Sequence, residues 1–235
     1  MTIKFAKRRL MFCCALIFFA GKNCFSASKA LAVGSVYSFS NIGHIIVNSD
    51  GGDIKFLKSR DGITRVHATG PDAERSVISQ DGDTLKVENR GGFWGLGFSR
   101  RVDFLIEVGK SIVPEAIISL GNGGIEVKTS VQNLKINAGN LTLYTEDLIG
   151  NTDISAGSGV FTFVHKIFRP ISYFIKAGNV QITSLLSHEY RSVSNSISGG
   201  MVQLKESSLP MRHDDADFNL SGRVGKAELF FHNID

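Results

Sequence analysis

Residues 120–143 read LGNGGIEVKTSVQNLKINAGNLTL, and this stretch decides the fold because its pattern returns. In LGNGGIEV and again in NAGNLTL, a Gly-Asn pair precedes a triplet in which apolar and polar residues alternate. Ile125, Leu134 and Leu143 are nine residues apart. Successive side chains of a strand point to opposite faces, so the triplets IEV, LKI and LTL predict short strands with an apolar inner face.

Glycines at similar turns set a longer period along the second half of the chain. Gly121, Gly139, Gly157, Gly178 and Gly199 follow one another at intervals of 18, 18, 21 and 21 residues. A repeat of this size is typical of a solenoid, in which each rung buries its apolar edge against its neighbours. We therefore expect an all-β, β-helix or solenoid-like stack of short strands over residues 109–235, with a β-sandwich as the alternative.

Residues 33–108 predict β-hairpins that precede this stack and continue into it as one domain. Short alternating segments at 44–47, 53–57, 63–68, 77–79, 84–88 and 102–108 are separated by the turns SDGGD, SRDG and QDGD. Glycine and aspartate accept the positive φ that tight hairpins require. Residues 71–75 predict one short helical turn.

The first 27 residues are typical of a signal peptide, with cleavage expected between residues 27 and 32. The basic start MTIKFAKRR precedes LMFCCALIFFA, an apolar run of eleven residues. A bilayer needs about 20 apolar residues, so this run is too short to cross it, although an uncleaved anchor is the alternative. We expect an exported protein in the periplasm, at the cell surface or associated with the outer membrane.

Removal of the signal peptide changes the interpretation of charge and of cysteine content. The net charge of the whole chain is +4, and residues 1–27 carry five cations and no acid, which leaves +4 − 5 = −1. The basic character therefore gives no support for nucleic-acid binding. All three cysteines, Cys13, Cys14 and Cys24, lie in the removed segment, so the core must be stable without disulfides.

The order NSDGGDIKF, then SIVP, then GNGGIEV, LKINAGNLTL and ISAGSGVFTF resembles the bacterial putative-adhesin family of unknown function, often described as auto-transporter adhesin, head-GIN-like domains. The resemblance covers roughly residues 42–231. It implies an exported, right-handed, β-helix-like domain. Its motifs are structural, and it implies no catalytic residue.

Candidate catalytic and metal-binding motifs are better explained as turns and loops. A phosphate cradle leads into a helix, whereas LGNGG leads into a strand. HDDAD at residues 213–217 lacks the ligand register of a calcium loop. We expect no cofactor, no metal and no catalytic residue. Glu126, Glu146 and Asp153 are the carboxylates to compare if the protein is a carbohydrate-active enzyme instead.

The most distinctive segment is RGGFWGLGFSRR at residues 90–101, which holds the single tryptophan. Exposed aromatic residues beside arginines suit a partner surface or a membrane interface. The alternative is that the aromatic residues fold back and cover the open end of the stack. The candidate contact residues are Phe93, Trp94, Leu96, Phe98, Arg100 and Arg101.

These observations favour a non-enzymatic scaffold or adhesin-like domain of the bacterial envelope. Regularly spaced polar residues on the sheet faces, such as Glu126, Lys128, Lys135 and Thr142, suit an extended partner. That partner would be an envelope protein or a polysaccharide, and not nucleic acid. The alternatives are a carbohydrate-active enzyme on a β-helix and a membrane-peripheral module that uses the aromatic segment.

Overall fold

The computed structural model describes residues 29–30, 36–89, 101–212 and 216–234. Thirteen strands in these residues belong to one hydrogen-bonded sheet, and the single helical element is a 3-10 turn at Ala73–Arg75. The prediction of an all-β fold is confirmed. One continuous sheet is what a stack of rungs requires, whereas a sandwich would need two separate sheets.

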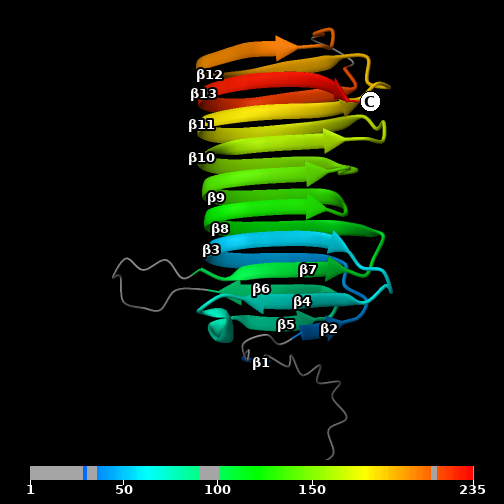
Figure 1. Ribbon diagram of the computed structural model, residues 1–235, viewed down its shortest axis with the longest axis vertical. Coiled ribbons are helices and arrows are strands. Elements are labelled where there is room, and N and C mark those ends of the chain that lie inside the picture. Colours follow the sequence, from blue (N-terminus) through cyan, green and yellow to red (C-terminus); the bar gives the residue numbers. More distant parts are fainter. Residues whose placement is uncertain (1–28, 31–35, 90–100, 213–215, 235) are drawn as a thin grey trace, which may run out of the picture.

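Seven long strands stack in parallel to form the body of the molecule (Figure 1). Each ribbon turns back on itself near its middle, so one strand supplies both halves of a rung. The expected pairs of short strands are therefore halves of single bent strands. The long strands are β3 (His44–Lys58), β8 (Ile112–Lys128), β9 (Ser130–Glu146), β10 (Asn151–His165), β11 (Ile171–Ser187), β12 (Val193–Ser207) and β13 (Phe218–Ile234).

The bend is built from glycines stacked on one another. The residues that flank Gly121 pair with those that flank Gly139, and the same holds for Gly139 with Gly157 and for Gly157 with Gly178. A Cβ atom on Gly139 would lie 2.4 Å from the carbonyl oxygen of Gly121, and one on Gly178 would lie 2.3 Å from that of Gly157. The bend therefore has no room for a side chain. The spacings of 18, 18 and 21 residues are the rung lengths of the stack.

The last predicted interval, from Gly178 to Gly199, does not correspond to a rung. The spatial order is β11, β13, β12, so the last strand lies between two strands that precede it in the chain. Gly225 of β13 takes the bend position above Gly178, and Gly200 takes it above Gly225. Gly199 instead lies opposite Val224. The sequence did not predict this strand order, because the interval from Gly178 to Gly199 equals that from Gly157 to Gly178.

The stack begins earlier than expected, at β3. The sequence predicted a hairpin across SDGGD, but residues 44–58 form one bent strand that pairs in parallel with β8. Asp50 takes the bend position opposite Gly121, and Gly52, with φ +112, lies two residues beyond it, where a Cβ atom would lie 2.1 Å from the carbonyl oxygen of Val102. The glycine pair was interpreted as a hairpin turn because both turns and bends need residues without side-chain clashes.

Short strands cover the other edge of β3. The hairpin expected across SRDG does not form, because β4, the strand after it, pairs with β2 and β7 and not with β3. The predicted pairing across QDGD is confirmed, with β5 antiparallel to β6. β6 pairs with the first half of β3 and β7 with its second half. These strands are β1 (Lys29–Ala30), β2 (Val36–Phe39), β4 (Thr64–Thr69), β5 (Val77–Asp81), β6 (Thr84–Asn89) and β7 (Asp103–Val108).

The core consists of columns of apolar side chains that run along the stack. One column contains six residues in register, none more than 2% exposed: Ile54, Ile125, Leu143, Phe161, Ile182 and Leu229. Full burial of one such side chain stabilises a fold by about 1.5–3 kcal/mol. Repetition of the triplet pattern therefore builds a core without disulfides in the described residues.

A polar cluster interrupts this core near the ends of β9, β10 and β11. Nε2 of His165 lies 2.8 Å from the hydroxyl of Tyr173, whose ring stacks on Phe163. His165 is 1% exposed, and burial lowers its pKa to about 4. Burial also raises the pKa of Tyr173. His165 is therefore neutral at physiological pH and forms one hydrogen bond within the apolar interior.

Substitution of Gly139 by alanine should strongly destabilise the protein. The new Cβ atom would meet the backbone of Gly121, and we expect a loss of about 2–4 kcal/mol in the free energy of unfolding. Gly82→Ala is the control, because it has a φ of +60 but nothing within 4 Å of a Cβ atom, and it should cost about 1 kcal/mol. Denaturant unfolding measures both, and equal losses would contradict the proposed role of the bend.

Acid should destabilise the protein through His165. The unfolded chain takes up a proton near pH 6.5, whereas folded His165 does so only near pH 4. Stability should therefore be highest above pH 6.5 and fall by up to about 3 kcal/mol as the pH decreases to 4. The His165→Gln variant should lack this component. Unfolding free energies at several pH values give the comparison, and parallel profiles would contradict the prediction.

Candidate functional site

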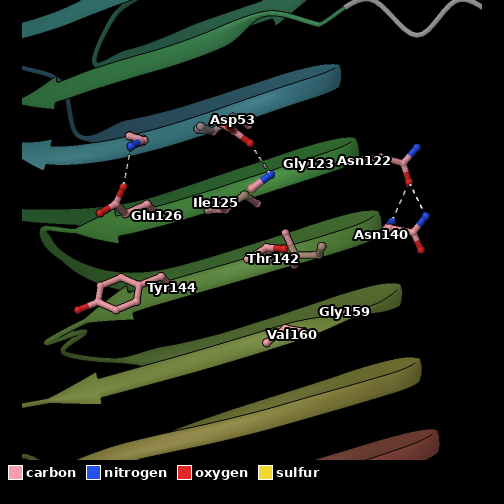
Figure 2. Close-up of a pocket in the computed structure, with 14 residues that line it drawn as sticks. Asp53, Asn122, Gly123, Ile125, Glu126, Asn140, Thr142, Tyr144, Gly159 and Val160 are labelled. Carbon is pink, nitrogen blue, oxygen red and sulfur yellow. Dashed lines mark hydrogen bonds and ion pairs between the residues drawn. The ribbon is translucent and has the colours of Figure 1, made fainter.

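An open groove of about 780 Å³ crosses the outer face of the second halves of β3, β8, β9 and β10. Figure 2 shows Asn122 and Asn140 at the end where the strands bend, and Glu126 and Tyr144 toward the other end. Thr142 and Val160 lie between these ends. The groove therefore offers both hydrogen-bonding groups and exposed apolar surface.

Backbone packing explains why the surface is hollow here. Gly123, with φ +154, has no space for a Cβ atom, which would lie 1.9 Å from the carbonyl oxygen of Gly52. A Cβ atom on Gly159 would lie 2.0 Å from the carbonyl oxygen of Leu141. The close approach of rungs next to the bend thus removes side chains from the floor of the groove.

The bend end of the groove is ordered by a ladder of polar side chains. Oδ1 of Asn122 accepts hydrogen bonds from the backbone N–H of Asn140 at 2.9 Å and from its Nδ2 at 3.0 Å. The hydroxyl of Ser158 donates to Oδ1 of Asn140 at 2.5 Å. These residues occupy equivalent positions on successive rungs, so each side chain fixes the next.

Asp53 holds the rim of the groove on β3. Its Oδ1 accepts a hydrogen bond from the N–H of Gly124 at 3.0 Å, and its Oδ2 lies 3.3 Å from Arg101. Its own N–H donates to Oδ1 of Asp103 at 2.8 Å. Asp53 thereby connects the first rung to β8 and to the strand that follows residues 90–100.

Charged side chains alternate at the other end of the groove. Glu126 lies 3.1 Å from Lys55 and 2.6 Å from Lys128, and the ammonium of Lys128 is 5.2 Å from the centre of the Tyr144 ring. The hydrogen bond from Lys128 is the main reason that the pKa of Glu126 is lowered. Glu146 lies 2.5 Å from Lys166, which lowers its pKa in the same way. Both carboxylates are therefore ionised.

The state of these carboxylates differs from that of the acid and base pair of a glycosidase. A general acid needs a raised pKa, whereas partners lower the pKa of Glu126 and Glu146. Asp153, the third carboxylate to compare, lies on the first half of β10, opposite Lys135 and Phe174. The described residues also contain no group of three or more histidine, cysteine, aspartate or glutamate side chains placed to bind a metal.

Of the predicted contact segment at residues 90–101, the structure describes only the last residue. Phe93, Trp94, Leu96, Phe98 and Arg100 lie outside the described residues, so their role stays a prediction. Arg101 is described, and it is exposed beside Asp53 and Asp103. Within the described part of the chain, no helix has both the length and the apolar character needed to cross a membrane.

The outward positions of Glu126, Lys128, Lys135 and Thr142 agree with the alternation seen in the sequence. The sequence did not identify Asp53, Asn140 or Tyr144 as parts of one site. The available signal was the similarity of Gly51-Gly52-Asp53 to Asn122-Gly123-Gly124, which occupy equivalent positions on two rungs.

No family model and no curated protein matches the sequence. Solved structures that are similar include a putative adhesin from Bacteroides fragilis, 13% identical over 87% of this chain and 99% of that chain, with a TM-score of 0.43. A putative cell adhesion protein from Clostridium sporogenes is 9% identical over 89% of this chain and 100% of that chain, with a TM-score of 0.43. A putative lipid binding protein from Parabacteroides distasonis is 10% identical over 86% and 97%, with a TM-score of 0.34. The first two names agree with the resemblance found in the sequence, but the likeness assigns no role to any residue.

The ion pairs at the groove should contribute little to stability, because they are solvent-exposed in part. Glu126→Gln should change the free energy of unfolding by less than about 1 kcal/mol. Leu143→Ala, a substitution in the buried column on the inner side of the same sheet, should cost about 2–5 kcal/mol. Denaturant unfolding distinguishes the two. A large loss for Glu126→Gln would show that the charged rim is structural and not available for a ligand.

Proposed function

We propose that the protein is an exported, non-enzymatic binding domain of adhesin type, which holds an extended glycan in the groove across β3, β8, β9 and β10. The observation that carries this proposal is an open groove whose floor is kept free of side chains by Gly123, Gly124 and Gly159. Export rests on the signal-peptide pattern of residues 1–27.

The lining of the groove suits a neutral or mixed polar polymer. Asn122, Asn140 and Thr142 supply amide and hydroxyl groups that can bond to sugar hydroxyls. Tyr144 supplies the aromatic ring of the groove, with a polar tip and an apolar face. Side chains fixed by their neighbours lose little entropy when a ligand binds, and this favours affinity.

The state of the carboxylates supports a non-enzymatic role. Ionised Glu126 and Glu146 can accept hydrogen bonds from a ligand but cannot donate a proton to a leaving group. The groove is also open to solvent along its length, whereas catalysis by charged groups gains from exclusion of water. Binding without turnover is therefore the function that this geometry supports best.

Blocking the groove should abolish glycan binding without unfolding the protein. Thr142 is exposed on the outer face of β9, so Thr142→Trp places a large ring in the groove while the core is unchanged. On an array of defined glycans, we expect signals of the unmodified protein to fall at least about tenfold with Thr142→Trp and with Tyr144→Ala.

Thr142→Ser is the matched control, because it keeps the hydroxyl and the open space, and it should retain the signals. Thermal unfolding of all variants tests whether the fold is intact. Glycan signals that are unaffected by Thr142→Trp would exclude the groove as the binding site, and release of shorter saccharides on incubation would support the enzyme alternative.

A further inference from the structure

A second hollow of about 900 Å³ lies beside the bend, on the first halves of β10, β11, β13 and β12. Four outward side chains cross it in register, in the order Ser155, Lys176, Arg223 and Ser198. The wall next to them consists of small residues, which include the consecutive glycines of β12. Lys176 and Arg223 are exposed and stand beside a surface without large side chains.

The charges of this pair are not balanced within the described residues. Lys176 and Arg223 are direct neighbours on adjacent strands, and neither forms an ion pair with a described carboxylate. Like charges placed directly opposite each other destabilise a sheet. Most other lysines on the described sheet surface are paired with acids, as in Lys55 with Glu126 and Lys135 with Glu115. Lys176 and Arg223 therefore differ from these lysines, because two adjacent cations without an acid destabilise the sheet.

The surroundings leave the positive potential of the pair largely intact. The column that contains Lys176 and Arg223 continues along the stack through the neutral residues Asn137, Ser119 and Asn48, and it reaches an acid only beyond them, at Glu88 of β6. The acidic residue of the adjoining column, Asp153, lies opposite Phe174 and not opposite either cation. Lys176 also lies 5.1 Å from the centre of the Phe174 ring, which positions its ammonium group.

We propose that Lys176 and Arg223 form a binding site for an acidic polysaccharide. Neighbouring strands are about 4.8 Å apart, so the two cations can bind one sulfate, phosphate or carboxylate group together. The hydroxyl groups of Ser155 and Ser198 flank the cations and suit the sugar hydroxyls on either side of that anionic group. This site lies on the other side of the bend from the first groove and does not depend on the function proposed for it.

Other polyanions fit this surface less well. Attraction to an anionic membrane requires clusters of about four to eight cations, whereas this column contains two. Single-stranded nucleic acid needs a series of aromatic rings on which bases stack, and the hollow is lined by small and hydrophilic residues. A polymer with spaced charges and many hydroxyl groups matches two cations in a polar column.

The test is binding of the purified chain to dextran sulfate, with uncharged dextran of the same length as the reference. We expect binding to dextran sulfate at 50 mM NaCl that weakens at 200 mM, because salt screens the interaction. The Lys176→Ala/Arg223→Ala variant should bind at least about tenfold more weakly. Lys176→Arg should retain binding, since the charge is kept.

A variant with Lys135→Ala and Lys166→Ala is the matched control, because it loses the same charge from lysines that are already paired with acids. It should lose less than about threefold in affinity. Equal losses in the two double variants, or equal binding of dextran and dextran sulfate, would overturn the proposal. Stronger binding to phosphatidylglycerol vesicles than to dextran sulfate would overturn the choice of a polysaccharide. Loss of binding to neutral glycans in the Thr142→Trp variant is independent of every one of these outcomes.

Discussion

The contact on which the rest of the structure depends is that of a glycine Cα with the backbone of the rung before it. At the bend, the carbonyl oxygen of Gly121 lies where a side chain of Gly139 would begin, and the same contact recurs between Gly157 and Gly178. It lets two rungs approach to hydrogen-bonding distance at their sharpest point. Both halves of each strand can then pair with the same neighbours, and the interior columns of apolar residues come into register.

The same contact determines where ligands can reach the molecule. Glycines lie beside the bend as well as at it, so one hollow forms beside Gly123 and Gly159 and another beside Gly199 and Gly200. The polar side chains that surround these hollows, such as those of Asn140 and Lys176, point outward and take no part in the core. Their identities are therefore free to vary with the ligand, while the glycines and the inner columns preserve the scaffold.

The repeat itself could be predicted from the sequence, because alternation and glycine spacing are local patterns. The rung lengths, the inner faces and the hairpin across QDGD follow from residues within about 20 positions of each other. The first rung was missed because Asp50, and not a glycine, takes its bend position, while Gly51 and Gly52 beside it satisfy a hairpin turn. The order of β12 and β13 was missed because Gly199 continues the spacing of 21 residues although it belongs to a strand that is displaced by one place.

The two candidate sites could not be predicted from the sequence, because each consists of residues that are far apart in the chain. Asp53 contacts Gly124, which is 71 residues later in the chain, and Lys176 lies beside Arg223 across an interval that includes the whole of β12. Such neighbours are set by register between strands, and register depends on the order of the stack. The individual polar residues were visible in the sequence, but their grouping was not.

The insertion of β13 between β11 and β12 also constrains how the protein folds. During synthesis from the N-terminus, β8, β9, β10 and β11 can pair one after another, each on the free edge of the strand before it. β12 cannot continue this series, because the edge of β11 belongs to a strand that has not yet appeared. The native pairing on the edge of β11 therefore requires β13, and an edge that stays open until β13 is made invites aggregation. The last strand, β13, thus completes the sheet by pairing with β11 on one side and with β12, the strand before it in the chain, on the other.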